Sequence, residues 1–179
     1  MEIEILNMIQ KIRTPFGDFI MPIITKLGNA GIFWILLTIV LLIIPKTRKT
    51  GFFMLFSLVI EAGVCNLVLK ALVARIRPFD VNTAVQLLVA KPTDYSFPSG
   101  HTGASFASCA SLLFAGNKKI GWPAAVLAFL IAFSRLYLYV HYPTDVLAGV
   151  ILGIASGFLG DFVAAKLWKK IEEVKNNKK

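Results

Sequence analysis

Five long apolar runs restrict what this chain can fold into. They begin at Gly31, Gly51, Ser99, Ile120 and Pro143, and the second reads GFFMLFSLVIEAGVCNLVLKALV. A helix of about 20 apolar residues crosses a hydrocarbon core about 30 Å thick, and helices satisfy their own backbone hydrogen bonds in lipid. Because 56% of residues are hydrophobic and only 16% are charged, the sequence predicts an all-α, multi-pass transmembrane bundle with about five spanning helices.

The N-terminal residues follow a different pattern. Ile5 and Met8 alternate with Glu4 and Lys11, which is typical of an amphipathic helix lying in the membrane interface. We therefore expect one integral-membrane domain over residues 1–179. It consists of an interfacial segment (1–30), a helix bundle (31–168) and a basic cytoplasmic tail (169–179).

The basic residues predict an orientation in the membrane. They cluster after the first and third apolar runs and in the tail, namely Lys46, Arg48, Lys49, Lys118, Lys119, Lys166, Lys169, Lys170, Lys175, Lys178 and Lys179. Short cytoplasmic loops collect positive charge, so we expect the side that holds these residues, with the C-terminus, to be cytoplasmic. Segments 75–98 and 139–143 then face outward, together with the N-terminus.

The net charge of +9 is thus interpreted as a topology signal and a preference for the anionic headgroups of the lipid bilayer. Nucleic acid is not an expected partner, because the basic residues are spread over loops and tail without a dedicated soluble domain. The oligomeric state is left open.

Three polar stretches gather on the predicted outer side, and KALVARIRP is the first. Lys70 and Arg77 are seven positions apart, about two helical turns, so both are expected on one helix face before Pro78 ends the helix. Cations near hydrocarbon are costly and usually face a partner or a water-filled cavity. The alternative is that each side chain extends to the interface. Arg75 is interpreted as a solvated loop charge, with attraction of an anionic headgroup as the alternative.

The second stretch, FPSGHT, has the features of an anion site. Ser99 is a favourable residue to cap a helix, and Gly100 lets a ligand approach the backbone. The free N–H groups of a helix start attract anions. His101 would lie in the first turn of that helix, directed at the bound group.

The third stretch, SRLYLYVHYPTD, places a histidine beside a carboxylate. Pro143 suits the first turn of a helix, so His141 is expected on the preceding bend and Asp145 just inside the helix. The carboxylate can then hold one imidazole nitrogen while the other faces the cavity, which is how a nucleophilic histidine is oriented. Arg135 adds a third cation or serves as an interfacial anchor.

Together these stretches indicate phosphoryl transfer. Three cations and a helix N-terminus would meet the charge on the phosphoryl oxygens, while one histidine attacks phosphorus and the other protonates the leaving oxygen. No cluster of His, Cys or carboxylates has the spacing of metal ligands. We therefore expect neither a metal nor another cofactor.

The same residues resemble the signatures of the type 2 phosphatidic acid phosphatase superfamily, the histidine phosphatases related to vanadium haloperoxidases. The signatures stand here as KALVARIRP, PSGH and SRLYLYVHYPTD. The resemblance implies a phosphohistidine on His141, orientation of that ring by Asp145, and a general acid at His101. It also implies a metal-independent phosphate cradle made by Lys70, Arg77, Ser99, Gly100 and Arg135.

Among the branches of this superfamily, the chain resembles the small bacterial undecaprenyl diphosphate phosphatases, which act on a cell-wall carrier lipid at the outer leaflet. Several of those carry Pro-Ser-Asp-His, whereas this chain has Gly100. Phosphatidylglycerophosphate and phosphatidic acid phosphatases therefore remain alternatives. A transporter or scramblase of anionic lipids is an alternative from another class, although such proteins usually show repeated halves that this sequence lacks.

Overall fold

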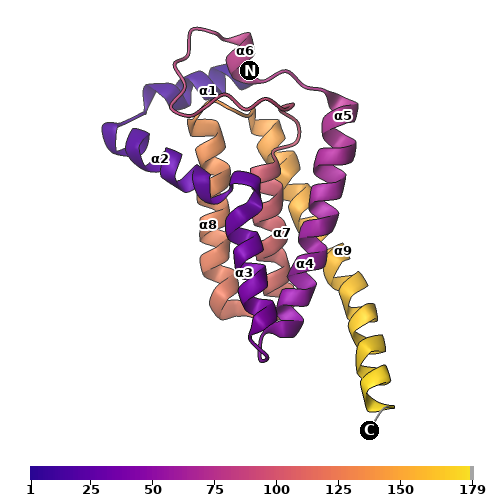
Figure 1. Cartoon of the computed structure of the whole chain (residues 1–179). Helices are drawn as coiled ribbons and strands as arrows, with labels where there is room; N and C mark the ends of the chain where they lie inside the picture. The colour runs from indigo at the N-terminus through magenta and orange to yellow at the C-terminus, as the bar shows by residue number, and fades with distance from the viewer. Residues whose placement is uncertain (178–179) are drawn as a thin grey trace.

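The computed structural model describes residues 1–177 and shows an all-helical membrane bundle (Figure 1). Its elements are α1 (Glu2–Lys11), α2 (Pro15–Leu27), the short 3-10 turn η1 (Asn29–Gly31), α3 (Ile32–Ile43), α4 (Arg48–Ala62), the π-helical segment η2 (Gly63–Leu69), α5 (Lys70–Val73), α6 (Pro78–Val81), α7 (Gly100–Phe114), α8 (Lys118–Tyr137) and α9 (Pro143–Asn176). Each of the five predicted apolar runs forms a helix. The all-α multi-pass fold is therefore confirmed, with three or four candidate spans in place of the predicted five or so.

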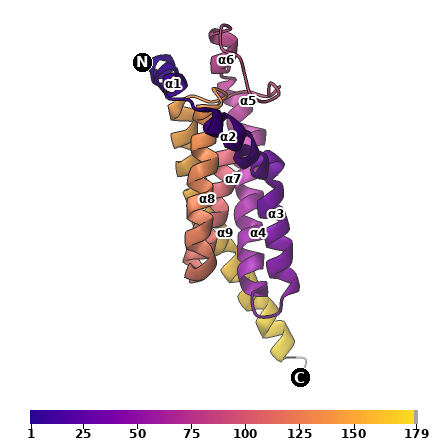
Figure 2. The same ribbon diagram turned by 90° about the vertical axis from the view of Figure 1, so that its left-hand side faces the viewer.

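Three helical segments are long and apolar enough to cross a membrane by themselves, namely Arg48–Val81, Lys118–Tyr137 and Pro143–Asn176. A fourth span results if Pro15–Leu27 and Asn29–Ile43, which meet at a 44° bend, are taken together. The remaining helix, α7, has 15 residues and rises only about 22 Å. It is surrounded by α4, α8 and α9 and forms the centre of the bundle (Figures 1 and 2).

Small residues allow α7 to lie in the centre. Its sequence GHTGASFASCASLLF consists largely of Gly, Ala and Ser, and most of these side chains are buried. Gly153 of α9 faces α7 so closely that a Cβ there would lie 2.6 Å from the carbonyl oxygen of Gly103. Gly149 and Gly157, one turn to either side, meet α7 in the same way. This close approach is the usual means by which membrane helices gain packing energy.

The N-terminal segment is two helices rather than the single interfacial helix that the sequence predicts. Thr14 caps α2 by accepting a hydrogen bond from the Gly17 amide at 3.1 Å, and Pro15 opens that helix. An ion pair between Arg13 and Asp18, 2.8 Å apart, holds the corner. Because Thr14 and Pro15 end one helix and start another, α1 lies across one end of the bundle while α2 descends into α3 (Figures 1 and 2).

The two ends of the bundle carry different parts of the chain, and the connections next to the predicted basic clusters share one end. The connections that hold Lys46 and Lys118 lie at one end, where α9 also extends beyond the other helices (Figure 1). The opposite end carries α1, α6 and the segment 82–99 (Figure 1). Lys178 and Lys179 of the predicted basic tail lie outside the described residues.

We predict that the stability of the bundle depends on the absence of a side chain at Gly153, where α9 contacts α7. In Gly153→Ala the new methyl group meets the backbone of α7 and cannot be accommodated without a shift, so the free energy of unfolding should fall by about 1–3 kcal/mol. Gly63→Ala is the control, because no atom lies within 4 Å of its added Cβ and alanine favours helix over glycine. Thermal unfolding in detergent should show a lower Tm for the first variant alone; equal Tm values would contradict the prediction.

Candidate active site

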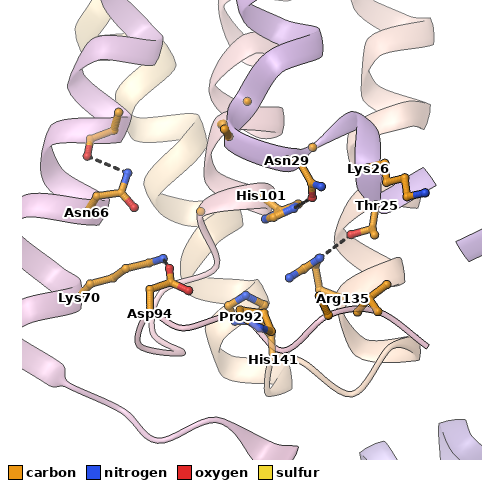
Figure 3. Close-up of a pocket in the computed structure, with 18 of the residues that line it drawn as sticks. Thr25, Lys26, Asn29, Asn66, Lys70, Pro92, Asp94, His101, Arg135 and His141 are labelled. Carbon is orange, nitrogen blue, oxygen red and sulfur yellow. Dashed lines mark hydrogen bonds and ion pairs between the residues drawn. The ribbon is translucent and has the colours of Figure 1, made fainter. Parts of the chain in front are cut away.

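A cavity of about 900 Å³ opens at the end of the bundle that carries α1 and α6. Six of the eight site residues predicted from the sequence line it: Lys70, Arg77, Gly100, His101, Arg135 and His141. Figure 3 shows His101, Arg135 and His141 around one space, with Lys70 approaching from the opposite side. Side chains far apart in the sequence therefore share a single polar chamber.

Lys70 and Arg77 reach this chamber by different routes. Lys70 begins α5 directly after the π-helical segment η2, and α5 ends at Val73. Ala74 then takes a left-handed conformation (φ 46°), and Arg77 is extended ahead of Pro78. The expectation of one continuous helix from Lys70 to Arg77 is therefore wrong, because the chain turns at Ala74 to bring Arg77 inward.

Arg77 is buried and held by backbone groups. Its side chain is 4% exposed, with Nη1 donating to the Val140 carbonyl at 2.6 Å and Nε to the Asp94 carbonyl at 2.8 Å. Nη1 also lies 3.3 Å from Nε2 of His141. These bonds fix a positive charge directly beside the ring nitrogen that faces the cavity.

The bend before α9 positions His141 as the sequence predicts. Tyr142 is extended and Pro143 opens the helix, so Asp145 lies in its first turn. Nδ1 of His141 is 3.5 Å from Oδ2 of Asp145 and has no nearer polar partner. Asp145 is fully buried, and the same Oδ2 accepts from the Tyr142 amide at 2.9 Å and from Ser96 Oγ at 2.5 Å. The carboxylate is thus fixed behind the ring.

Burial keeps His141 neutral. Desolvation lowers the pKa of His141 far below its usual value; the Asp145 carboxylate opposes this shift, and the guanidinium groups of Arg135 and Arg77 add to it. A neutral imidazole has a lone pair. His141 can therefore act as a nucleophile or base near neutral pH.

Arg75 is not the solvated loop charge that the sequence suggests. Its Nη1 donates to Oδ1 of Asp145 at 2.6 Å, and its Nη2 donates to Glu2 of α1 at 2.5 Å. The guanidinium also lies over the Tyr142 ring at 3.8 Å from its centroid. Arg75 therefore balances the charge of the buried carboxylate and ties the N-terminus to the site.

The start of α7 presents backbone and one histidine to the cavity. Ser99 caps the helix as predicted, but its hydroxyl is buried and accepts from Thr102 Oγ1 at 2.9 Å. It does not line the cavity, whereas Gly100 and His101 do. A Cβ on Gly100 would meet its nearest neighbour, Cys65, at an ordinary 3.6 Å. Neighbouring side chains therefore do not require glycine at position 100.

Two residues of the N-terminal segment complete the site, and sequence reasoning missed both. Asn29 Oδ1 lies 2.9 Å from Nε2 of His101, and Thr25 Oγ1 accepts from Nη1 of Arg135 at 2.5 Å (Figure 3). Because an amide oxygen only accepts, Nε2 carries a proton in this contact and Nδ1 is left for exchange with a ligand. The glycines at positions 28 and 31 are a sequence signal for a break in the helix, but no local signal shows that this break lies beside His101 and Arg135.

A helix bundle that places two histidines and three cations in one cavity defines a membrane phosphatase. The chain belongs to the PAP2 superfamily, whose family model matches residues 50–168. That match contains the eight predicted site residues and excludes Thr25 and Asn29.

Known proteins are similar over most of the chain. An undecaprenyl-diphosphatase of Sulfolobus acidocaldarius is 35% identical over 173 residues, which cover 96% of this chain and 83% of that protein. The undecaprenyl-diphosphatase BcrC of Bacillus subtilis is 36% identical over 146 residues, covering 79% and 72%. The crystal structure of Aquifex aeolicus LpxE has a TM-score of 0.77 at 28% identity, with 89% of this chain and 93% of that chain covered.

We predict that Asn29 is a positioning residue for His101. Asn29→Ala should lower kcat by about 10- to 100-fold with little change in KM, because the ring loses the contact that sets its orientation. Asn29→Asp keeps an acceptor oxygen and should retain more activity. The control is Gln10→Ala, which removes a 2.9 Å bond from the N-terminal segment to the Tyr137 carbonyl without touching a histidine. Equal losses in Asn29→Ala and Gln10→Ala would indicate a purely structural role.

Proposed function

We propose that this protein is an integral-membrane lipid phosphatase that removes the terminal phosphate of undecaprenyl diphosphate at the extracytoplasmic face through a phosphohistidine intermediate. One observation carries the proposal. Nε2 of a buried, neutral His141 lies 3.3 Å from Arg77 in the same cavity as His101, Lys70 and Arg135. A nucleophile, an acid and a set of cations thus converge on a volume large enough for a diphosphate.

The first chemical step uses both histidines. Nε2 of His141 forms a bond to the terminal phosphorus, and the bond from phosphorus to the bridging oxygen breaks. His101 enters this step protonated on both ring nitrogens, and the bridging oxygen leaves with the lipid and takes the Nδ1 proton. Asp145 and Arg75 act from behind the ring: the carboxylate stabilises the positive charge that develops on the His141 ring, and Arg75 holds the carboxylate in place.

The second step releases phosphate. Water attacks phosphorus, the bond to Nε2 breaks, and His101 accepts the proton that the water loses. His141 and His101 are then restored. In both steps Lys70, Arg77, Arg135 and the amides at the start of α7 stabilise charge on the phosphoryl oxygens. Ser99 contributes to this set as the cap of α7, because its hydroxyl is engaged by Thr102 and its amide donates to the Asp145 carbonyl. The proposed reaction requires no metal or other cofactor.

The proposed substrate rests on the relatives and on the lining of the cavity. The relatives over most of the chain include proteins named undecaprenyl-diphosphatase. On the side of α3, α4 and α7 the cavity is lined by Ile35, Leu58, Ala62 and Ala104, which suits an apolar chain next to a charged headgroup. The bilayer and its lipid phosphates are therefore the partners that we propose.

Two glycerophospholipid substrates are kept as alternatives because of a second group of relatives. Phosphatidylglycerophosphatase B of Bacillus subtilis is 34% identical over 161 residues. The crystal structure of a PAP2-type phosphatidylglycerolphosphate phosphatase from that organism has a TM-score of 0.74 at 28% identity, covering 92% of this chain. Phosphatidylglycerophosphate and phosphatidic acid therefore belong in any test.

The proposed orientation follows from charge. The α3–α4 and α7–α8 connections lie at the end of the bundle opposite α1 and α6 (Figure 1). Lys46 lies in the first connection, Arg48 begins α4, and Lys118 and Lys119 begin α8. By the positive-inside rule that end is cytoplasmic, as is the C-terminus, and the cavity faces outward. In a bacterium this corresponds to the periplasmic or outer side of the inner membrane.

The deciding experiment measures phosphate release from undecaprenyl diphosphate, phosphatidylglycerophosphate and phosphatidic acid by the purified protein in detergent with a chelator present. We expect turnover of the diphosphate to exceed that of the other two, and His141→Ala to abolish it while leaving the Tm unchanged. Preference for a glycerophospholipid would instead assign the enzyme to phospholipid metabolism. A His141→Ala variant with near-normal activity would refute the mechanism.

The same preparation tests the transporter alternative. If none of the three lipids releases phosphate, the protein is reconstituted into vesicles with a fluorescent anionic lipid. Transbilayer movement that depends on Arg77 and Arg135 would then support a transporter or scramblase.

A further inference from the structure

The carboxylate of Asp94 occupies the cation cluster of the candidate active site. It forms an ion pair with Nζ of Lys70, and its Oδ1 lies 2.7 Å from Nη2 of Arg77 (Figure 3). The Asp94 carbonyl oxygen also accepts from Nε of Arg77 at 2.8 Å. Asp94 lies on the segment between α6 and α7 and was not among the residues that the sequence indicated.

A bound phosphate would use the same N–H donors that contact Asp94. Lys70 and Arg77 are two of the cations that the proposed mechanism assigns to the phosphoryl oxygens, and each donates to Asp94. Lys70 is 11% exposed and Arg77 is 4% exposed, whereas the Asp94 side chain is 51% exposed. The two cations are therefore set deep in the wall of the cavity, and the carboxylate reaches them from its open side.

Asp94 stays charged at any pH at which the protein would work. Partial burial by itself would raise the pKa of Asp94, but the Lys70 ammonium and the Arg77 guanidinium lower it to about 2. Since the pKa in the folded protein lies below the ordinary 3.8, the ion pairs are complete above about pH 4 and are lost only as the pH falls toward 2. A ligand must displace the carboxylate, because protonation does not remove it.

We propose that Asp94 is a specificity-determining residue that keeps singly charged phosphodiesters out of the phosphate site while allowing a terminal phosphate to enter. The inference rests on the proposed phosphatase function. It adds a residue that lies outside the three sequence motifs.

The discrimination follows from a comparison of charge. The phosphodiester of an ordinary membrane lipid carries one negative charge, which only replaces the charge of the Asp94 carboxylate. A terminal phosphate carries about −1.5 to −2 at neutral pH and three acceptor oxygens, so it gains more from Lys70, Arg77 and Arg135 than the carboxylate does. Phosphodiesters are abundant in the bilayer around the cavity. Without Asp94 they would occupy the cations and act as competitive inhibitors.

The experiment compares wild type with Asp94→Asn in micelles of a neutral detergent. Activity on the preferred lipid phosphate is measured with increasing phosphatidylglycerol, which is a singly charged phosphodiester, or with diacylglycerol, which has no phosphate, as the lipid control. We expect the apparent KM of the wild type to change less than about twofold, and that of Asp94→Asn to rise about tenfold or more with phosphatidylglycerol. Without added lipid, Asp94→Asn should bind inorganic phosphate about tenfold more tightly than wild type.

Two further variants separate the charge effect from folding. Asp80→Asn is the matched control, because it makes the same change on an exposed residue of α6 and should behave as wild type. Asp94→Glu keeps the carboxylate and should restore insensitivity to phosphatidylglycerol. Inhibition by phosphatidylglycerol that is equal in wild type and Asp94→Asn would overturn the proposal. Weaker phosphate binding in Asp94→Asn would also overturn it, since Asp94 would then organise the site.

The binding measurement also separates this proposal from the proposed function. Binding of inorganic phosphate is followed by isothermal calorimetry and needs no turnover. If wild type hydrolyses none of the lipids but Asp94→Asn binds phosphate more tightly, the phosphatase function fails while Asp94 remains a competitor for the anion site. If the enzyme is active and the two proteins bind phosphate equally, the Asp94 proposal fails by itself.

Discussion

The structure depends on keeping a group of cations at the end of an apolar bundle, largely out of contact with water. Arg77 and Arg135 are each 4% exposed, and buried charges are costly unless they are paired and hydrogen-bonded. Asp94 and the Val140 carbonyl meet this requirement for Arg77. Arg135 meets it only in part, because Nη1 donates to Thr25 while its buried Nε has no partner among the described residues. The same arrangement that stabilises these charges leaves them directed at one cavity, ready to bind an anion.

The central helix provides the rigid support for this cluster. Because α7 consists of small residues, α9 approaches it closely at Gly149 and Gly153. The Ser99 amide donates to the Asp145 carbonyl at 3.1 Å, which joins the start of α7 to the start of α9. The two histidines lie beside this joint, one in the first turn of α7 and the other on the bend before α9. Their separation is therefore set by backbone contacts rather than by flexible side chains.

The N-terminal helices complete the catalytic centre in addition to any role at the membrane interface. Glu2 holds Arg75 behind Asp145, and Asn29 holds His101. The match to the PAP2 superfamily begins at residue 50, so these contacts come from a part of the chain that the family signature does not describe. Members of the family can therefore differ in the segment that contacts His101 without any change in the three motifs.

The sequence by itself determined the features that depend on neighbouring residues. Apolar runs predict the helices, Ser99 predicts the start of α7, and Pro143 predicts the bend that carries His141. Tertiary structure alone decided the contacts between distant segments. Asn29 and His101 are 72 positions apart, Arg75 and Asp145 are 70 apart, and Lys70 and Asp94 are 24 apart. Local residue preferences contain no information on such pairings, because they arise only when packing brings separate helices and loops to one end of the bundle. The turn at Ala74 also depends on tertiary structure. An alanine gives no local signal for the left-handed conformation that brings Arg77 into the cavity.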